Sequence, residues 1–260
     1  AGELRKLGRV DHGDAFLDTD PLERSRGITI FSKQAVMRFG GNEYTLLDTP
    51  GHVDFSAETE RALRVLDYAV LVISGTDGVQ SHTETIWRLL RRYNIPTFIF
   101  VNKMDISLLG KDSLAAELKR KLSPGCVEFY GERSKEELCE ELAECSENLM
   151  NSFLENGSVP QELISAAIFR REVFPVVYGS ALKLKGVETL LRAIDKFAFQ
   201  PEQSREFGAL IYKITSDDQG ARLTHMKITG GSLKVRTLLD CGGKQEKVNQ
   251  IRVYSGTKFT

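Results

Sequence analysis

The sequence has few cysteines, no long apolar run and almost no net charge. Its four cysteines, Cys126, Cys139, Cys145 and Cys241, include no C-x2-C pair, which argues against a zinc site and a disulfide framework. We expect reduced thiols and a cytoplasmic protein. No apolar run reaches the roughly 20 residues that a membrane helix needs, and residues 1–6 do not resemble a signal peptide. No membrane partner is therefore expected.

The near-neutral charge excludes a general nucleic-acid binder. Lys and Arg number 35 against 36 Asp and Glu, for a net charge of -1, whereas such binders carry a strongly basic face. No DNA partner is expected, and any contact with RNA would use a local patch. The length of 260 residues and the 41% hydrophobic content are sufficient for a buried core and for two domains.

Apolar runs of strand length alternate with helical patterns in the central part of the chain. The runs at 69–73, 97–101 and 173–178 are continuous, which indicates strands buried on both faces. The spacing predicts helices over the segments between and around them. This pattern is typical of an α/β fold with a doubly wound, mostly parallel sheet. The predicted helices cover residues 58–66, 82–93, 107–122, 134–154 and 187–197.

The helical pattern at 134–154 carries an acidic run that includes Glu136, Glu140 and Glu144. Such a run is usually a solvated face; the alternative is a docking surface for a basic partner.

The two ends of the chain have different patterns from its centre. Residues 1–10 predict the tail of a helix and residues 11–26 a long polar loop, followed by a hairpin of two runs, 35–39 and 44–47. After a polar linker at 200–205 the period becomes two, which predicts part of a small β-barrel over 206–260. Its expected strands are 208–215, 222–228, 235–239 and 247–253. The preceding domain is predicted at 1–199, with a helical insert at about 107–171.

Three predicted strands are followed by loops with special residues. Loops at the carboxyl ends of parallel strands line one crevice, so we expect the three loops to meet. Asn102 and Asp105 offer an amide and a carboxylate to a purine edge, and the carboxylate suits the two N–H groups that guanine shows and adenine lacks. Backbone N–H groups near Ser180 and Ala181 would complete the pocket. The loops are Asp48-Thr49-Pro50-Gly51-His52, Asn102-Lys103-Met104-Asp105 and Gly179-Ser180-Ala181-Leu182.

These motifs, with Arg26-Gly27-Ile28-Thr29-Ile30 before them, resemble the two switch segments and the two guanine-recognition motifs of translational GTPases. More narrowly, Leu22 to Ile30 and Arg64-Val65-Leu66-Asp67 resemble elongation factor G and the tetracycline ribosomal protection proteins. The likeness covers essentially the whole chain. It implies a ribosome-associated GTPase that uses GTP or GDP with Mg2+.

The resemblance also implies a role for each motif residue. Thr29 and Asp48 would hold Mg2+, Gly51 would offer its N–H to the γ-phosphate, and His52 would orient or activate the attacking water. Phosphoryl transfer depends on positioning and charge stabilisation more than on a strong base, which agrees with these roles. The implied nucleotide-binding residues are Asp48, Thr49, Pro50, Gly51, His52, Asn102, Lys103, Met104, Asp105, Ser180, Ala181 and Leu182.

One motif of the family is not found in these residues. A P-loop, G-x-x-x-x-G-K-[ST], would hold the β- and γ-phosphates, but Gly110-Lys111-Asp112 and Gly243-Lys244-Gln245 both lack the required residues. The missing strand would lie mid-sheet, between those ending at Asp48 and at Ile73. Either the 260 residues are a piece of a longer protein, which we favour, or another segment or chain supplies that strand. Alone, they are expected to bind GTP weakly or not at all.

Two classes of function follow from the motifs. The first is a GTPase that acts at the factor-binding site of the ribosome, on its rRNA and proteins. The second is a ribosome-binding module that hydrolyses nothing. Within the first class, the segment between Asp105 and Gly179 is short for elongation factor G, which favours the tetracycline protection branch.

Overall fold

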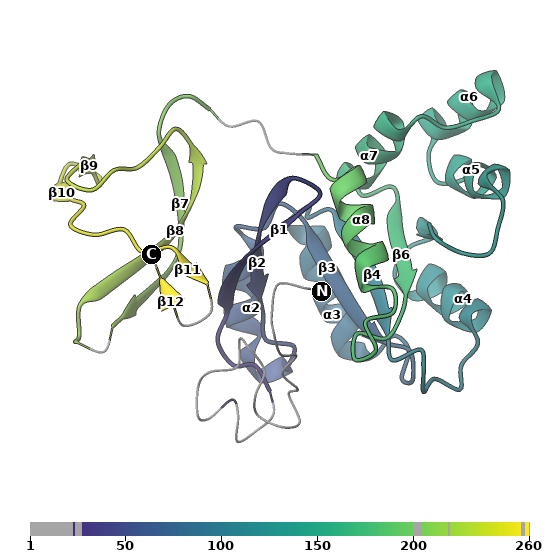
Figure 1. Ribbon diagram of the computed structural model, residues 1–260, viewed down its shortest axis with the longest axis horizontal. Helices are drawn as coiled ribbons and strands as arrows, with labels where there is room; N and C mark the ends of the chain where they lie inside the picture. Colours follow the sequence, from purple (N-terminus) through teal and green to yellow (C-terminus); the bar gives the residue numbers. More distant parts are fainter. Residues whose placement is uncertain (1–22, 24–27, 200–203, 218, 256–257, 260) are drawn as a thin grey trace. The chain divides into compact units, whose positions relative to one another are not determined.

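The computed structural model describes residues 23, 28–199, 204–217, 219–255 and 258–259 (Figure 1). The helix tail predicted at 1–10, most of the loop at 11–26 and the linker residues 200–203 lie outside this range. The chain forms two compact units. The described part of the first unit comprises residues 38–42 and 66–199, and that of the second comprises residue 23, residues 28–37, residues 43–65 and the described residues from 204 onward.

The first unit is built on a four-stranded parallel sheet with strand order β3-β4-β6-β5. The register of β4 aligns Ser74 of β3 with Asn102, and Val101 with Tyr178 of β6. These pairings bring the carboxyl ends of three strands level with one another. The strands are β3 (Ala69–Ser74), β4 (Thr97–Asn102), β5 (Cys126–Glu128) and β6 (Phe174–Tyr178).

Helices pack on both faces of this sheet, as the alternating pattern predicted. In Figure 1, α8 lies in front of the sheet and α3 lies behind it. No helix among the described residues is long and apolar enough to cross a membrane. The helices of this unit are α3 (Ser81–Arg92), α4 (Lys111–Lys121), α5 (Lys135–Ala143), α6 (Glu147–Asn156), α7 (Gln161–Phe169) and α8 (Val187–Phe197).

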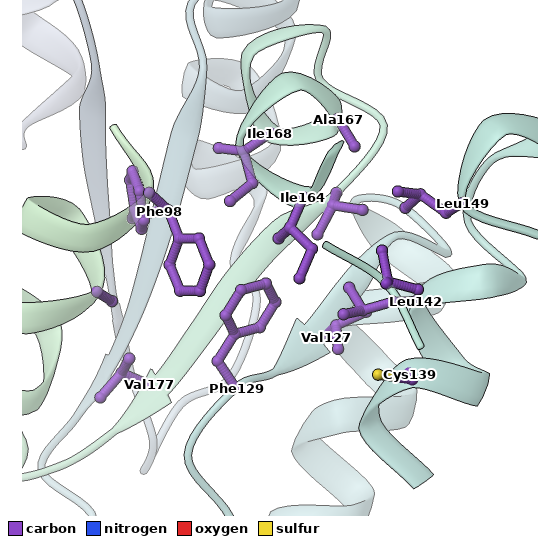
Figure 2. Packing of buried hydrophobic residues seen from close by; sticks show 14 of the residues in the cluster. Phe98, Val127, Phe129, Cys139, Leu142, Leu149, Ile164, Ala167, Ile168 and Val177 are labelled. Carbon is purple, nitrogen blue, oxygen red and sulfur yellow. The ribbon is translucent and has the colours of Figure 1, made fainter. Parts of the chain in front are cut away.

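The core of the first unit joins the sheet to the helices that follow β5. Phe98 of β4, Val127 of β5 and Leu142 of α5 are each fully buried in one cluster (Figure 2). Phe129 and Phe197 meet edge to face within it, with ring centroids 5.2 Å apart. Because close-packed interiors leave little freedom to shift, this core fixes the strand ends that carry the loops.

Strand β3 differs from the expectation that all the apolar strands are buried on both faces. β4 and β6 are buried along almost their whole length, but Val70 and Val72 of β3 are 41% and 58% exposed. β3 pairs only with β4 within the described sheet and lies at its edge. The prediction that β3 is buried on both faces of the sheet is therefore wrong, although its apolar run is continuous.

The helix predicted at 134–154 is two helices. Ser134 caps α5 through a reciprocal pair of hydrogen bonds with Glu137. α5 ends at Ala143, Cys145 N–H donates to Leu142 O at 3.0 Å, and Ser146 is extended before α6 begins. The sequence pattern also gave no sign of β5 or α7 as separate elements.

The second unit contains most of the hairpin, the helix after it and the later strands. The predictions for β1, β2, α2, β7 and β8 are confirmed to within three residues at each end.

Two later strands differ from their predictions. The strand predicted at 247–253 is wrong, because β10 ends at Lys247, and the one predicted at 235–239 begins only at Leu238. Just outside these two strands, Arg236 before β9 donates its N–H to Val248 O after β10 at 2.7 Å. Arg236 has a positive φ, so the backbone is not extended at that position. The elements are β1 (Lys33–Phe39), β2 (Asn42–Asp48), η2 (Val53–Phe55), α2 (Ser56–Leu63), β7 (Gly208–Ser216), β8 (Arg222–Gly230), β9 (Leu238–Asp240), β10 (Gln245–Lys247), β11 (Tyr254–Ser255) and β12 (Lys258–Phe259).

The packing of the helices that follow β5 can be tested at Leu142. Leu142→Ala should lower the free energy of unfolding by about 2 to 5 kcal/mol, because it leaves a cavity in a fully buried position. Urea denaturation measures this. Leu154 of α6 is 72% exposed, so Leu154→Ala is the matched control and should change the value by no more than about 0.5 kcal/mol. Equal effects of the two substitutions would contradict the packing described.

Candidate functional site

Three loops of the first unit meet at the carboxyl ends of β3, β4 and β6. Gly75 N–H donates to Asn102 O at 2.7 Å, and Met104 N–H donates to Gly179 O at 3.0 Å. Ser107 Oγ donates to Gly75 O at 2.6 Å. A Cβ on Gly75 would lie 2.7 Å from the Met104 sulfur, so the glycine makes room for that side chain. The loops at 102–105 and 179–182, which the sequence predicted to meet, are therefore adjacent. The loop after β3 was not among the predicted loops.

The side-chain oxygen of Asn102 joins these two loops. Oδ1 accepts a hydrogen bond from Lys103 N–H and another from Ala181 N–H, each at 2.8 Å. Lys103 has a φ of 61°, a left-handed conformation that a non-glycine residue adopts only where its surroundings require it. With its oxygen engaged, Asn102 retains the NH2 group of its side-chain amide as a donor.

Asp105 lies in the same cluster as an ionised carboxylate. Hydrogen bonds from the side chains of Ser180 and Lys183 hold the pKa of Asp105 below its ordinary value, and Lys183 Nζ is 3.0 Å from Asp105 Oδ2. The carboxylate is thus an acceptor for paired N–H donors. Lys183 was missed in the sequence, although it follows Ser180 by three residues in the same loop.

The loop after β6 is closed on itself. Ser180 N–H donates to Lys185 O and Lys185 N–H donates to Ser180 O, both at 3.0 Å. Gly186 has a φ of 77°, and a Cβ there would lie 2.7 Å from Tyr178 O, so only glycine fits. Ser180 is buried and Leu182 is 62% exposed. Of the predicted pocket residues in this loop, Ser180 is held by its backbone hydrogen bonds to Lys185, whereas the Leu182 side chain is accessible to solvent.

Asp77 is a further acidic residue that the sequence did not single out. It lies in the loop after β3, where hydrogen bonds from Ser74 and Thr76 lower its pKa, with a smaller contribution from the charge of Lys103. The Lys103 ammonium thus has a carboxylate near it. No sequence motif marks this proximity, because it joins loops 26 residues apart.

The predicted residues Asp48 to His52 lie in the second unit, where β2 ends at Asp48. Pro50 is buried, and its carbonyl oxygen accepts a hydrogen bond from Thr59 Oγ1 at 2.8 Å. This bond fixes the turn against α2. Gly51 is exposed, and a Cβ built on it would meet no atom within 4 Å. Internal packing therefore does not explain a glycine at this position.

His52 is half exposed and faces Asp54. The Asp54 N–H donates to His52 Nδ1 at 3.3 Å. Asp54 Oδ2 lies 3.4 Å from the same nitrogen. The ring therefore has one nitrogen engaged locally and the other available for a water or a ligand.

The implied magnesium residues are also in the second unit. Thr29 lies just before β1, and Asp48 is the last residue of β2; Arg26 and Gly27 of the same motif are outside the described residues. Within the described part of the chain, no group of three or more His, Cys, Asp or Glu side chains could hold a metal. One hydroxyl and one carboxylate fit Mg2+, which usually takes its other ligands from phosphates and water.

Comparison with known proteins identifies the family. Residues 1–200 match the family described as the elongation factor Tu GTP binding domain. The structure is similar to the crystal structure of a protein from Thermus thermophilus, with a TM-score of 0.84 and 22% sequence identity. The match covers 99% of this chain and 46% of that one, so the chain spans about half the length of the protein it resembles. At this identity the likeness shows the fold alone.

The bridging role of Asn102 can be tested by removing its oxygen. Asn102→Ala deprives the Lys103 and Ala181 amides of their acceptor, so both should exchange hydrogen about 10-fold faster or more. Amide exchange followed by NMR measures this. Asn151, exposed on α6, provides the control Asn151→Ala, which should leave the two amides unchanged. Unchanged exchange at Ala181 in Asn102→Ala would refute the bridge.

Proposed function

Because this chain belongs to the family of the elongation factor Tu GTP-binding domain, we propose that it is the nucleotide-binding part of a translational GTPase. The protein would bind GTP or GDP with Mg2+ and hydrolyse GTP on the ribosome. The observation that carries this proposal is the arrangement at the ends of β4 and β6. There the Asn102 oxygen ties two loops together and leaves a carboxylate, Asp105, beside them.

Guanine recognition follows from the donors and acceptors in that cluster. The Asp105 carboxylate can accept the N1 and N2 hydrogens of guanine, for which the Lys183 ammonium has to give way. The Asn102 amide can donate to a ring nitrogen of the base. Lys103 and Leu182, both exposed, can pack across its faces. Adenine would leave the carboxylate without donors, which is a strong penalty at a site built for hydrogen bonding.

Residues of the second unit would bind the phosphates. Open space around Gly51 suits the close approach of a γ-phosphate to its N–H group. Thr29 and Asp48 would hold Mg2+, which neutralises charge on the phosphates when bound. His52, through Nε2, would orient or activate the attacking water, while Thr49 and Pro50 shape the turn between the metal and phosphate residues.

The partner in this proposal is the ribosome, at the site where translation factors bind its rRNA and proteins. A net charge of -1 supports a local contact rather than general nucleic-acid binding, and we propose no DNA or membrane partner and a cytoplasmic location. We also propose the domain organisation expected from the sequence, with a nucleotide-binding domain over 1–199, a helical insert at about 107–171, a linker at 200–205 and part of a β-barrel over 206–260.

Within the family we propose the tetracycline ribosomal protection branch, with elongation factor G as the alternative. The support is the short segment between Asp105 and Gly179, which holds α4 to α7 with β5 and β6. Expression of the full-length protein should restore translation in the presence of tetracycline. Failure to restore it would favour elongation factor G.

Ribosome-stimulated hydrolysis by the full-length protein tests the proposed function. We expect hydrolysis of GTP to accelerate when ribosomes are added, and His52→Ala to lower the rate by about 100-fold or more while GTP binding persists. A protein that binds ribosomes without hydrolysing GTP would instead be the non-hydrolysing module. A full-length protein that binds no GTP would overturn the proposal.

A substitution at Gly51 can distinguish a role in ligand binding from a role in the stability of the fold. Gly51→Ala should change the free energy of unfolding by no more than about 0.5 kcal/mol, because the added methyl group meets nothing within 4 Å. The rate of GTP hydrolysis should nevertheless fall by about 10-fold or more, since the methyl group displaces the phosphate. Thermal melts and single-turnover hydrolysis measure the two effects.

The control for Gly51 is Gly110, which has equally open surroundings at the start of α4. Gly110→Ala should leave both stability and hydrolysis nearly unchanged. Full activity in Gly51→Ala would remove Gly51 from the phosphate site.

A further inference from the structure

Glu23 is a buried carboxylate next to the segment that carries Thr29. It is only 1% exposed, and it belongs to the motif Leu22 to Ile30, in which it has no assigned role. A carboxylate removed from water in this way requires hydrogen-bond donors or a positive charge beside it.

Four partners of Glu23 among the described residues lie in residues 28–33. Its Oε1 accepts hydrogen bonds from the N–H groups of Ile30 and Phe31, each at 3.0 Å, and its Oε2 pairs with Lys33 Nζ. Its backbone oxygen also accepts from Ile28 N–H at 3.3 Å. One residue thus binds the backbone on both sides of Thr29.

The charge of Glu23 is stabilised where it lies. Burial alone would raise its pKa, but the hydrogen bonds from Lys33, Phe31 and Ile30 outweigh that effect and hold the pKa below its ordinary value. The carboxylate is therefore ionised near neutral pH, and its bonds to the two N–H groups are charge-assisted, which makes them stronger than neutral ones.

A second glutamate holds the same segment from α2. Glu58 Oε1 accepts from Ser32 N–H at 3.2 Å and pairs with Lys213 Nζ of β7 at 2.5 Å. Its Oε2 lies 3.3 Å from Arg61. Ile30 and Phe31 are thus bound by Glu23, and the next residue, Ser32, is bound by Glu58. The backbone after Thr29 is fixed at three successive N–H groups.

We propose that Glu23 is a positioning residue for GTP hydrolysis, which fixes the backbone of residues 28–33 so that the Thr29 hydroxyl is held in place for the reaction. This inference rests on the proposed function. Catalysis of phosphoryl transfer depends on placement, and a displacement of about 1 Å can reduce a rate by about 100-fold. Glu23 itself does not touch the nucleotide in this account; it acts through the backbone.

The test compares Glu23→Ala and Glu23→Gln in the full-length protein. Glu23→Ala removes both acceptor oxygens, so the Ile30 and Phe31 amides should exchange about 10-fold faster or more. Single-turnover hydrolysis on ribosomes should fall by about 10- to 100-fold, while the KM for GTP changes by less than about 3-fold. Glu23→Gln keeps one acceptor oxygen and should lie between Glu23→Ala and the wild type in both measurements.

Glu246, exposed on β10, provides the control Glu246→Gln, which should match the wild type. If Glu23→Ala does not fold, as shown by circular dichroism, Glu23→Gln decides the result by the same two measurements. Faster amide exchange with an unchanged hydrolysis rate would overturn the inference, because Glu23 would then have only a structural role. Unchanged exchange would overturn it as well.

The outcomes for the inference and for the proposed function can be separated. A wild-type protein that shows no ribosome-stimulated hydrolysis would overturn the proposed function and with it the catalytic role of Glu23. A wild-type protein that hydrolyses GTP, beside a Glu23→Ala variant of equal rate, would overturn the role of Glu23 alone.

Discussion

Two hydrogen bonds to one atom, the Asn102 side-chain oxygen, organise the loops of the first unit that are proposed to bind the base. The atom accepts from the residue that follows it and from Ala181, in a loop 79 residues further along the chain. This geometry exists because β4 and β6 are paired in register and Phe98 and Phe100 of β4 are buried in the core. Asp105 and Lys183 then meet at 3.0 Å. The recognition chemistry thus depends on the packing of two strands.

The segments of the second unit that are proposed to meet the phosphates are held in another way. Side chains bind backbone groups there: Thr59 holds the Pro50 carbonyl, and Glu23 and Glu58 hold the N–H groups of residues 30–32. These bonds hold backbone groups beside residues that are themselves buried, among them Glu23, Ile30 and Thr59.

The sequence predicted those features that depend on local pattern. β4 and β6 followed from continuous apolar runs, and Asn102 and Asp105 followed from their position after β4. The prediction that β3 is buried on both faces was wrong. The apolar side chains of Val70 and Val72 show that the segment is hydrophobic, but they do not show whether another element packs over them. The break at residues 144–146 was missed because the charge pattern continues through it. Lys183, Asp77 and Glu23 were missed because their partners are set by tertiary contacts, which one sequence does not display.

Nucleotide selectivity tests whether Asn102 and Asp105 form a guanine site. The measurement is equilibrium binding of GDP, IDP and ADP to the full-length protein. IDP lacks the amino group that would reach Asp105 and should bind more weakly than GDP, while ADP should bind weaker still, by a factor on the order of 10⁴. Binding of ADP as tight as that of GDP would show that Asn102 and Asp105 do not select guanine.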